Sequence, residues 1–275
     1  MRSLPARFDR SNRRGHKPKL GQNFLVSPTA PRAIVDALGD LSHETVVEIG
    51  PGRGALTGLL AARAKQVIAV EIDPTLAAAL QGDAIEVHRQ DILSLDLTRL
   101  ATERDVRLQI IGNLPYYIST PILMHLFAHS AVIDRAVLMA QREVAARIGS
   151  EPGSRDYGLL SATTQMYANV ENLFTLPPEA FSPEPEVYST VFRLTIRPRF
   201  EELRVQASSF KRFLQQIFAQ KRKTLANNLR AAGYDPATVE SAFAQCKVAN
   251  THIRAEAVAL ETMACLFRAL NAEPM

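Results

Sequence analysis

The segment EIGPGRGALT holds the first residues whose types and spacing indicate ligand binding. Gly50, Gly52 and Gly54 alternate in the chain between a predicted strand and a predicted helix. Glycines let the backbone approach a ligand closely, and the N-terminus of the following helix favours negative charge. Such a loop suits a dinucleotide, and a tight turn that binds no ligand is the alternative interpretation.

Two carboxylates narrow the choice of ligand. Glu71 closes the run VIAVE and Asp91 closes IEVHRQD, so both are expected at the carboxyl ends of successive parallel strands, beside the glycine loop. An acid at the first position can accept hydrogen bonds from both ribose hydroxyls, and an acid at the second can accept one from an adenine amino group. Each acid alone could be a solvated strand end, whereas the set favours a nucleoside.

The run NLPYY closes a further predicted strand and suits methyl transfer to an exocyclic base nitrogen. The side-chain oxygen of Asn113 and the backbone carbonyl of Leu114 could accept the two hydrogens of that amine and hold it in line with a methyl sulfonium. Pro115 would stiffen the carbonyl, and Tyr116 would stack on the base and exclude water. This chemistry needs neither a metal nor a strong general base.

Other interpretations of NLPYY are open from the residues alone. An Asn-Pro type of turn with core tyrosines is the structural alternative. A nicotinamide-dependent oxidoreductase would need a hydride partner at this strand end, such as a His or a catalytic Lys or Tyr. Tyr117 has no assigned chemistry and is expected to pack into the fold.

The elements that must position these residues alternate between strand and helix patterns from Thr45 onward. Apolar, β-branched runs predict strands, and Ala/Leu-rich periodic runs predict helices between them. Strands regularly separated by helices imply parallel pairing, with both faces of the sheet covered. The predicted strands are 45–50, 66–73, 85–92, 106–113 and 133–141, and the predicted helices are 54–64, 74–81, 120–129 and 142–150.

The pattern changes near Arg197, after which only helical spacing is visible. The chain predicts one helix over 210–233, closed by Gly233, and further helices over 236–245 and 254–270. The run IRPRFEE is the best candidate for a linker. We therefore expect a flexible basic arm at 1–19, an α/β domain at 20–200 and a helical domain at 201–275.

Charge is concentrated in two places along a chain whose net charge is only +4. Residues 1–20 carry seven basic side chains and one acid, and residues 203–230 carry seven basic side chains and no acid. Local basic clusters on a nearly neutral body indicate phosphate contacts at defined places. A solvated helix face with a basic tail is the alternative. The candidate RNA-binding residues are Arg212, Lys221, Arg222 and Lys223.

The two cysteines and the overall composition suggest a soluble cytoplasmic protein. Cys246 and Cys265 are too few and too far apart in the sequence for a disulfide framework or a four-ligand zinc site, so we expect reduced thiols and a reducing compartment. The basic N-terminus has no apolar segment behind it, and no run approaches the length of a membrane span. At 275 residues and 47% apolar content, the chain can build a well-buried core.

The order of these motifs resembles the KsgA/RsmA family of ribosomal RNA adenine dimethyltransferases. The matching segments are GQNFL at 21–25, EIGPGRGALT, EID, QDIL, NLPYYISTPIL, QREVAARI, YGLLS and KRKTLANNL. The resemblance implies a Rossmann-like class I methyltransferase with a mostly parallel seven-stranded sheet and a small all-α C-terminal RNA-binding domain. It also implies S-adenosylmethionine as methyl donor and transfer of four methyl groups to N6 of two adjacent adenosines near the 3′ end of 16S rRNA, late in small-subunit assembly. Nothing in the sequence demands more than a monomer.

The resemblance assigns roles to individual residues. Those that would bind the cofactor are Asn23, Leu25, Gly50, Gly52, Glu71, Ile72, Asp91, Ile92 and Asn113. Those that would form the methyl-acceptor site are Asn113, Leu114, Pro115, Tyr116 and, from a later loop, Phe181. Relatives often carry PPPKVDS where this chain has SPEPEVYS, so Glu184 and Glu186 argue against phosphate contacts at that loop.

Two other function classes are compatible with much of the sequence. A large-subunit rRNA adenine methyltransferase of the macrolide-resistance type would share the motifs, although the basic helical C-terminal region and the second tyrosine of NLPYY favour the small-subunit enzyme. A non-catalytic rRNA-binding assembly factor would keep the fold, although the intact acidic and Asn-Leu-Pro-Tyr positions favour an enzyme.

Overall fold

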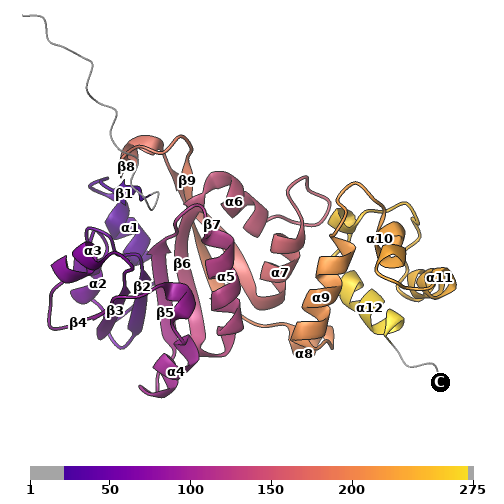
Figure 1. Ribbon diagram of the computed structural model, residues 1–275, viewed down its shortest axis with the longest axis horizontal. Helices are drawn as coiled ribbons and strands as arrows, with labels where there is room; N and C mark the ends of the chain where they lie inside the picture. Colours follow the sequence, from indigo (N-terminus) through magenta and orange to yellow (C-terminus); the bar gives the residue numbers. More distant parts are fainter. Residues whose placement is uncertain (1–21, 272–275) are drawn as a thin grey trace, which may run out of the picture.

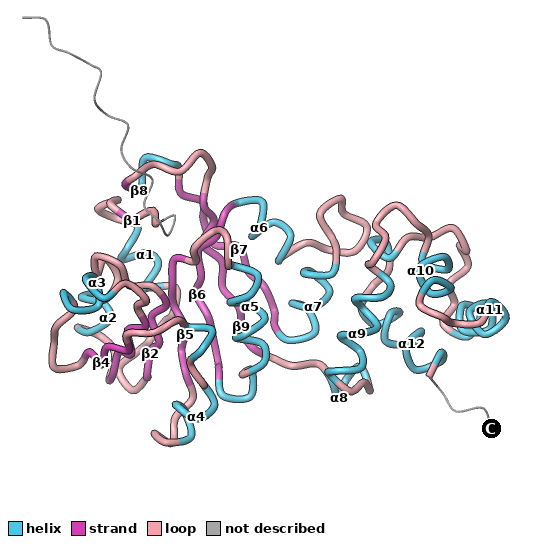
Figure 2. The backbone as a smooth tube through the Cα atoms, viewed as in Figure 1, coloured by secondary structure: helices cyan, strands magenta, loops and turns pink. Residues whose placement is uncertain are grey.

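The computed structural model describes residues 22–271, so the expected basic arm at 1–19 lies outside the described residues. The chain forms a seven-stranded sheet, a separate two-stranded sheet and helices, which Figures 1 and 2 show in the same view. The strands of the large sheet are β2 (Thr45–Ile49), β3 (Gln66–Val70), β4 (Ile85–His88), β5 (Leu108–Asn113), β6 (Ile133–Gln141), β7 (Ala168–Leu176) and β9 (Ser189–Ile196). The small sheet pairs β1 (Phe24–Leu25) with β8 (Phe181–Ser182).

The large sheet is mostly parallel, as the alternation of strands and helices predicted. Its strand order is β4-β3-β2-β5-β6-β9-β7, and β9 runs antiparallel to both of its neighbours. The parallel register aligns Ile49 of β2 with Val70 of β3 and with Gly112 of β5. The residues that follow these strands therefore lie at one edge of the sheet, where open α/β sheets bind ligands.

Helices cover both faces of the sheet and shield its apolar side chains. Helices α1 (Ala30–Asp36) and α2 (Thr57–Ala61) pack on one face, and α4 (Leu97–Thr102), α5 (Ser119–Ala128), α6 (Arg142–Ile148) and α7 (Leu159–Tyr167) contribute to the apolar cluster on the other. Helix α3 (Pro74–Ala79) begins with Pro74 in its first turn, as predicted. The predicted helix at 54–64 is shorter than expected, because its first residues form turns of the glycine loop. The short 3₁₀ helices are η1 (Ile92–Ser94), η2 (Ser130–Val132), η3 (Pro178–Ala180) and η4 (Ala255–Ala257).

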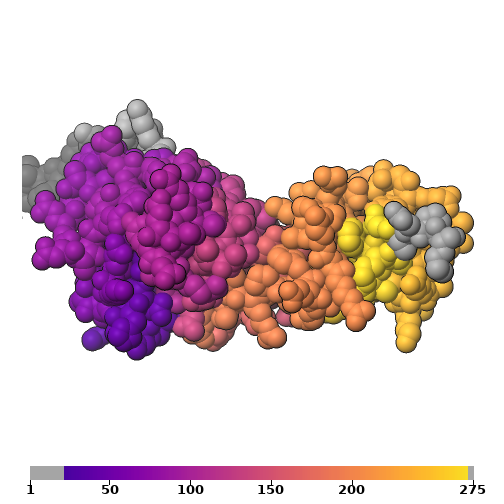
Figure 3. All heavy atoms as spheres, turned by 90° about the horizontal axis from the view of Figure 1, so that it is seen from below, coloured from indigo at the N-terminus to yellow at the C-terminus, as the bar shows by residue number. Residues whose placement is uncertain are grey.

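The described chain from Phe200 onward is helical, and Figures 1 and 3 show it extending from one end of the molecule. Its helices are α8 (Phe200–Leu203), α9 (Ala207–Ile217), α10 (Leu225–Ala231), α11 (Pro236–Gln245) and α12 (Leu260–Leu270). The apolar cluster of the sheet continues through α7 into these helices, so they are docked on the sheet through buried side chains. Arg199, in the expected linker, binds Glu202 and Glu261 and ties α8 to α12. No helix of the described chain has the length and apolar composition needed to cross a bilayer.

The expected single helix over 210–233 is wrong, because the chain leaves the helix after Ile217 and starts a new one at Leu225. The side chain of Asn228 donates to the Gln220 carbonyl at 3.2 Å and accepts from the Gln220 N–H at 3.1 Å. Thr224 accepts from the N–H of Asn227 and caps α10. These side-chain bonds replace helical backbone bonds, which is how Asn and Thr end or start helices. The predicted end near Gly233 is confirmed.

The expectation of reduced thiols is also wrong, because Cys246 and Cys265 form a disulfide. Cys246 ends α11 and Cys265 lies within α12, and the packing of these two helices brings their Cα atoms to 5.8 Å. That separation suits a disulfide, although the residues are 19 apart in the sequence. The argument for a reducing compartment from free cysteines therefore no longer applies.

Candidate active site

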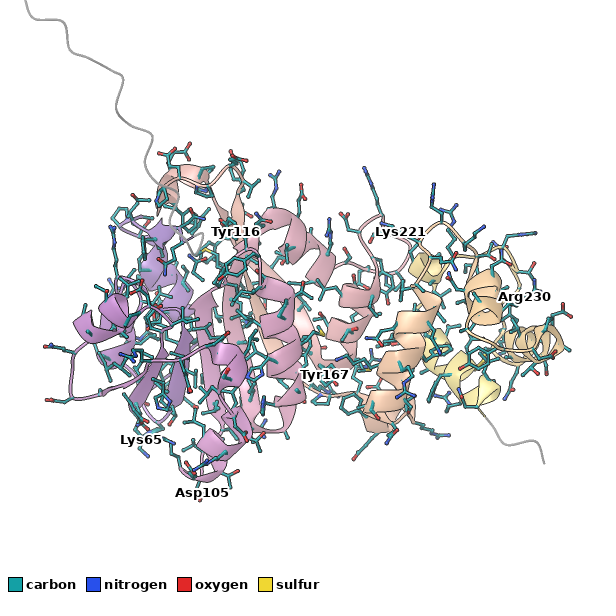
Figure 4. All side chains as sticks on the ribbon, viewed as in Figure 1. Lys65, Asp105, Tyr116, Tyr167, Lys221 and Arg230 are labelled. Atoms are coloured by element: carbon teal, nitrogen blue, oxygen red, sulfur yellow. A yellow bond between two sulfur atoms is a disulfide. The ribbon has the colours of Figure 1, made fainter. Side chains whose placement is uncertain are left out.

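A cleft opens at the carboxyl edge of the parallel strands, and Tyr116, labelled in Figure 4, lies at this edge. The cleft is lined by the segment before and within β1 and by the residues that follow β2, β3, β4 and β5. The predicted site residues that line it are Asn23, Leu25, Gly50, Gly52, Glu71, Ile72, Asp91, Ile92, Asn113, Leu114, Pro115 and Tyr116. Residues from five separate parts of the chain thus meet in one cleft.

The glycine loop has a backbone conformation that favours glycine. Gly50 and Gly52 have φ angles of +62° and +58°, a region that L side chains rarely adopt. A Cβ atom on Gly52 would lie 3.0 Å from the ring of Phe24. The guanidinium of Arg53 lies 4.5 Å from the centroid of the same ring. Phe24 therefore closes over the loop, and a side chain at position 52 would require the Phe24 ring to shift.

Glu71 connects the glycine loop to the end of β3. Its Oε2 accepts from the N–H of Gly52 at 3.0 Å, and its Oε1 accepts from the N–H of Asp73 at 2.9 Å. The residue is only 3% exposed. Each carboxylate oxygen has a further lone pair, so Glu71 can hold the loop and still accept from a ligand hydroxyl.

Asp91 and its neighbours form the next wall of the cleft. Asp91 Oδ1 accepts from the N–H of Leu93 at 2.9 Å, which starts η1. Ile92 is buried and Ile72 is 53% exposed, so the two apolar side chains differ in how much surface they offer. One carboxylate oxygen of Asp91 is thereby fixed in orientation while the other is left for a ligand.

Glu48 is a buried acid of the cleft that our sequence analysis did not identify. It lies within β2, is 1% exposed, and its Oε2 has no hydrogen-bond partner among the described residues. Burial raises the pKa of this carboxyl from 4.5 to about 7, and the nearby carboxylate of Glu71 adds to the rise. A charged residue inside the apolar run TVVEIG was the available signal, because an acid in a fully buried strand is costly without a partner.

The acceptor motif presents two oxygens without partners. The Asn113 side chain donates from Nδ2 to the backbone carbonyl of Asn23 at 3.0 Å, which directs its amide. The N–H of Leu114 donates to the carbonyl of Met139 at 2.9 Å. Within residues 22–271, neither Asn113 Oδ1 nor the Leu114 carbonyl accepts a hydrogen bond. The two oxygens that the sequence predicted as amine acceptors are both available.

The two tyrosines of the motif differ in exposure. The hydroxyl of Tyr116 lies 2.8 Å from Ser189 Oγ, and burial raises the pKa of Tyr116 above its ordinary value. Tyr117 is 63% exposed and lines the cleft. The expectation that Tyr117 packs into the fold is therefore wrong. Tyr116 takes the half-buried place against β9, and the next residue of the turn points outward.

Comparison with known proteins identifies the family of this chain. The sequence matches the family described as ribosomal RNA adenine dimethylase over residues 13–270. The chain belongs to this family. Ribosomal RNA small subunit methyltransferase A of Acidobacterium capsulatum is 55% identical over 93% of this chain and 92% of the relative. The protein of the same name from Koribacter versatilis is 50% identical, over 96% and 97% of the two chains. The solved structure of the 23S rRNA methyltransferase ErmE matches with a TM-score of 0.68 and 26% identity, over 90% of this chain and all of the other.

The chain is thus an rRNA adenine dimethyltransferase with a Rossmann-like class I methyltransferase fold. Its methyl donor is S-adenosylmethionine. The cleft suits this cofactor: the orphaned Oε2 of Glu48 can face a positive group, Glu71 and Asp91 have lone pairs for ribose and adenine, and the loop lets the backbone come close. The described residues contain no cluster of His, Cys, Asp and Glu suited to a metal ion.

Phe181 is the one predicted acceptor residue that does not line the cleft of this dimethyltransferase. It lies in β8, pairs with Leu25 and is 2% exposed within the apolar cluster of α1 and α2. In this position the ring supports the cleft wall from behind. Stacking on a base would require β8 to move.

The candidate RNA-binding residues of the dimethyltransferase lie away from the cleft. Arg212 is exposed on α9, and the other three, Lys221, Arg222 and Lys223, are exposed in the turn between α9 and α10. Figure 4 shows Lys221 and Tyr116 toward the same edge of the molecule. Leu225 and Leu229, in the helix that follows this turn, are fully buried. The basic turn is therefore anchored to the apolar core.

Proposed function

We propose that this enzyme dimethylates N6 of two adjacent adenosines in a hairpin near the 3′ end of 16S rRNA, within the immature small ribosomal subunit, and contributes to late subunit biogenesis. The pair of unpartnered oxygens on Asn113 and Leu114, at the mouth of a nucleoside cleft, carries the proposal. Relatives at 55% and 50% identity bear the name of small subunit methyltransferases, which supports the choice of subunit.

The chain's own residues would activate the amine by position. The adenine N6 lone pair is delocalised into the ring, so the amine is a poor nucleophile. Asn113 Oδ1 and the Leu114 carbonyl would each accept one N6 hydrogen and favour the pyramidal geometry of attack. Pro115 limits the freedom of that carbonyl, and Tyr116 would cover the base. S-adenosylmethionine supplies a methyl group on a good leaving group when it is bound.

The proton released by the amine needs no dedicated base. Burial keeps the pKa of Tyr116 above 10, so its hydroxyl stays protonated and serves as a hydrogen-bond partner of Ser189. Methylated N6 is strongly acidic while it carries the extra proton, and water at the open cleft can take that proton.

We assign cofactor contacts and RNA contacts to separate parts of the chain. The cofactor residues are proposed to be Asn23, Leu25, Gly50, Gly52, Glu71, Ile72, Asp91, Ile92 and Asn113. The acceptor site is proposed to be Asn113, Leu114, Pro115 and Tyr116, joined by Phe181 after movement of β8. Residues 20–200 would form the methyltransferase domain and residues 201–275 the RNA-binding domain, which would grip rRNA phosphates through Arg212, Lys221, Arg222 and Lys223. We place the enzyme in the cytoplasm, as a monomer.

The deciding experiment is transfer of labelled methyl groups from S-adenosylmethionine to small subunits that lack the modification. We expect incorporation into two neighbouring adenosines, mapped by primer extension. Asn113→Ala should lower the rate at least about 100-fold, because it removes an acceptor that acts on the reacting nitrogen. Asn169→Ala, an exposed asparagine of β7, is the matched control and should keep the wild-type rate. Transfer to no adenosine of the small subunit would refute the proposal.

A large-subunit rRNA substrate is the second candidate, because the ErmE structure is similar over its whole length and its name states a 23S rRNA substrate. The same labelled assay with isolated large subunits, or with protein-free 23S rRNA, separates the two. Incorporation there and none in the small subunit would favour this candidate.

A further inference from the structure

Several exposed apolar side chains lie at the edge of the sheet where the cleft opens, and two of them, Ile72 and Tyr117, line the cleft. Six large apolar side chains of the described chain are well exposed: Val26, Leu59, Ile72, Tyr117, Val187 and Tyr188. Leu59 lies in α2, outside the cleft lining. Val26 follows β1 of the small sheet, whereas Ile72 and Tyr117 follow β3 and β5, and Val187 and Tyr188 precede the antiparallel β9, so these four share the carboxyl edge of the large sheet. Exposed apolar patches around a pocket mark surfaces that bind a partner.

Tyr188 is held in place at this edge although the residue is 46% exposed. Its carbonyl accepts from the N–H of Arg142 at 2.9 Å, which extends the pairing of Gln141 with Ser189 by one residue. The guanidinium carbon of Arg142 lies 5.1 Å from the ring centroid, so one face of the ring is covered by a cation. Arg142 is exposed and forms no ion pair with a carboxylate of residues 22–271.

This pair is next to the acceptor site. Ser189, the residue after Tyr188, lies 2.8 Å from the hydroxyl of Tyr116. The register places Asn113 beside Met139 on β6, and Gln141 at the end of the same strand beside Ser189. A nucleotide adjoining a base held at Asn113 and Tyr116 would therefore pass near Tyr188.

The charge of the loop decides what kind of contact it can make. Residues 182–188 contain two exposed acids, Glu184 and Glu186, and no basic residue. Phosphate recognition by this loop is disfavoured, whereas stacking of an unpaired base on an aromatic ring does not depend on charge. Arg142 supplies the nearby cation for the backbone of the same nucleotide.

We propose that Tyr188, backed by Arg142, is a stacking platform for the nucleotide next to the adenosine in the acceptor site. The inference rests on the proposed function, since it gives that function a second base-binding position. The neighbouring base stacks on the free face of the Tyr188 ring, and this contact positions the substrate strand while Asn113 and Leu114 act on the target. Tyr188 is a positioning residue and takes no part in methyl transfer.

The test compares Tyr188→Ala with Tyr188→Phe in the full-length enzyme. Loss of a stacked base should weaken binding of a short, single-stranded, adenosine-containing RNA about tenfold, and raise the KM for small subunits by a similar factor. The KM for S-adenosylmethionine should not change, and Tyr188→Phe should behave as wild type because it keeps the ring. Leu59→Ala, which truncates another exposed apolar side chain outside the cleft lining, is the matched control and should change neither value.

Two results would overturn the platform. One is RNA binding by Tyr188→Ala within about twofold of wild type, which is too small for a lost stack. The other is an equal loss in Tyr188→Phe, which would assign the effect to the hydroxyl. RNA binding is measured with S-adenosylhomocysteine present, so it does not depend on turnover. If the wild-type enzyme methylates no small subunit, the proposed function fails, and the oligonucleotide still decides the stacking.

Discussion

Replacing Glu48 with glutamine should change how the stability of the protein depends on pH. Glu48 is 1% exposed in β2, and its Oε2 has no partner within the described residues. Burial is the main reason why the pKa of its carboxyl rises to about 7 from 4.5. The folded chain therefore keeps a proton on Glu48 over a pH range in which the unfolded chain has already released it.

The sign and size of the effect follow from this difference in pKa. Below pH 4.5 both states hold the proton, so the ionisation of Glu48 does not contribute to the free energy of unfolding. Between pH 4.5 and about 7 only the unfolded state is ionised, so the free energy of unfolding falls as pH rises. At about 1.4 kcal/mol for each pH unit, the loss reaches about 3 kcal/mol above pH 7. Glu48→Gln cannot ionise and should not show this loss.

Urea unfolding at several pH values between 4.5 and 8 measures the effect. The free energy of unfolding of Glu48→Gln minus that of the wild type should rise by about 3 kcal/mol across the range. The difference is informative because all other titrating groups are common to both proteins. Glu201→Gln, which removes an exposed carboxylate of α8, is the control and should follow the wild type. Parallel pH curves for Glu48→Gln and wild type would show that Glu48 is ionised at low cost, and the reasoning from burial would be refuted.

Three further predictions concern the covalent link, the glycine loop and the basic turn. Replacing both Cys246 and Cys265 with serine should lower the free energy of unfolding by about 3 kcal/mol relative to the oxidised protein, the value for a closed loop of about 20 residues; urea unfolding with and without a reductant checks this, and equal midpoints would contradict it. Gly52→Ala should lower the free energy of unfolding by about 1–2 kcal/mol because position 52 has a positive φ. Gly58→Ala, in α2 with open space around it, should raise that free energy by about 0.5–1 kcal/mol. Thermal unfolding of the two variants tests this, and an unchanged stability of Gly52→Ala would contradict the expected strain. Changing Lys221, Arg222 and Lys223 to glutamine should reduce the steepness of the plot of log affinity for small subunits against log salt concentration by about two to three. The control is Lys65→Gln, at an exposed lysine that Figure 4 shows at the far edge of the molecule, and it should leave this slope unchanged.

The sequence predicted the parts of the fold in which local pattern and tertiary structure agree. The β-branched runs ending at Ile49, Val70 and Asn113 became parallel strands, because such runs have few other ways to bury both faces. Their shared edge followed from the parallel arrangement, so Glu71 and Asp91 met the glycine loop as expected.

The differences arose where contacts between distant residues decide the structure. Helical spacing runs unbroken through 210–233, and only the bonds of Asn228 to Gln220 reveal the break. Cys246 and Cys265 come together only because α11 packs on α12. Tyr116 bonds to Ser189, 73 residues away, while Tyr117 is exposed, and no local pattern distinguishes the two tyrosines.

The attachment of the β1 segment has a kinetic consequence. β1 has two residues and pairs with the equally short β8. Asn23, just before β1, accepts a hydrogen bond at its carbonyl from the side-chain amide of Asn113, 90 residues away in the sequence. Long-range contacts form late in folding because the intervening chain must first be ordered, and a short pairing with few bonds opens at low free energy. In hydrogen exchange, the amide of Val26, which donates to Ala180, should therefore lose protection well before the amides of β2. Because Asn23, Phe24 and Leu25 line the cleft, opening of this segment would uncover the cofactor-binding residues while the sheet beneath stays folded.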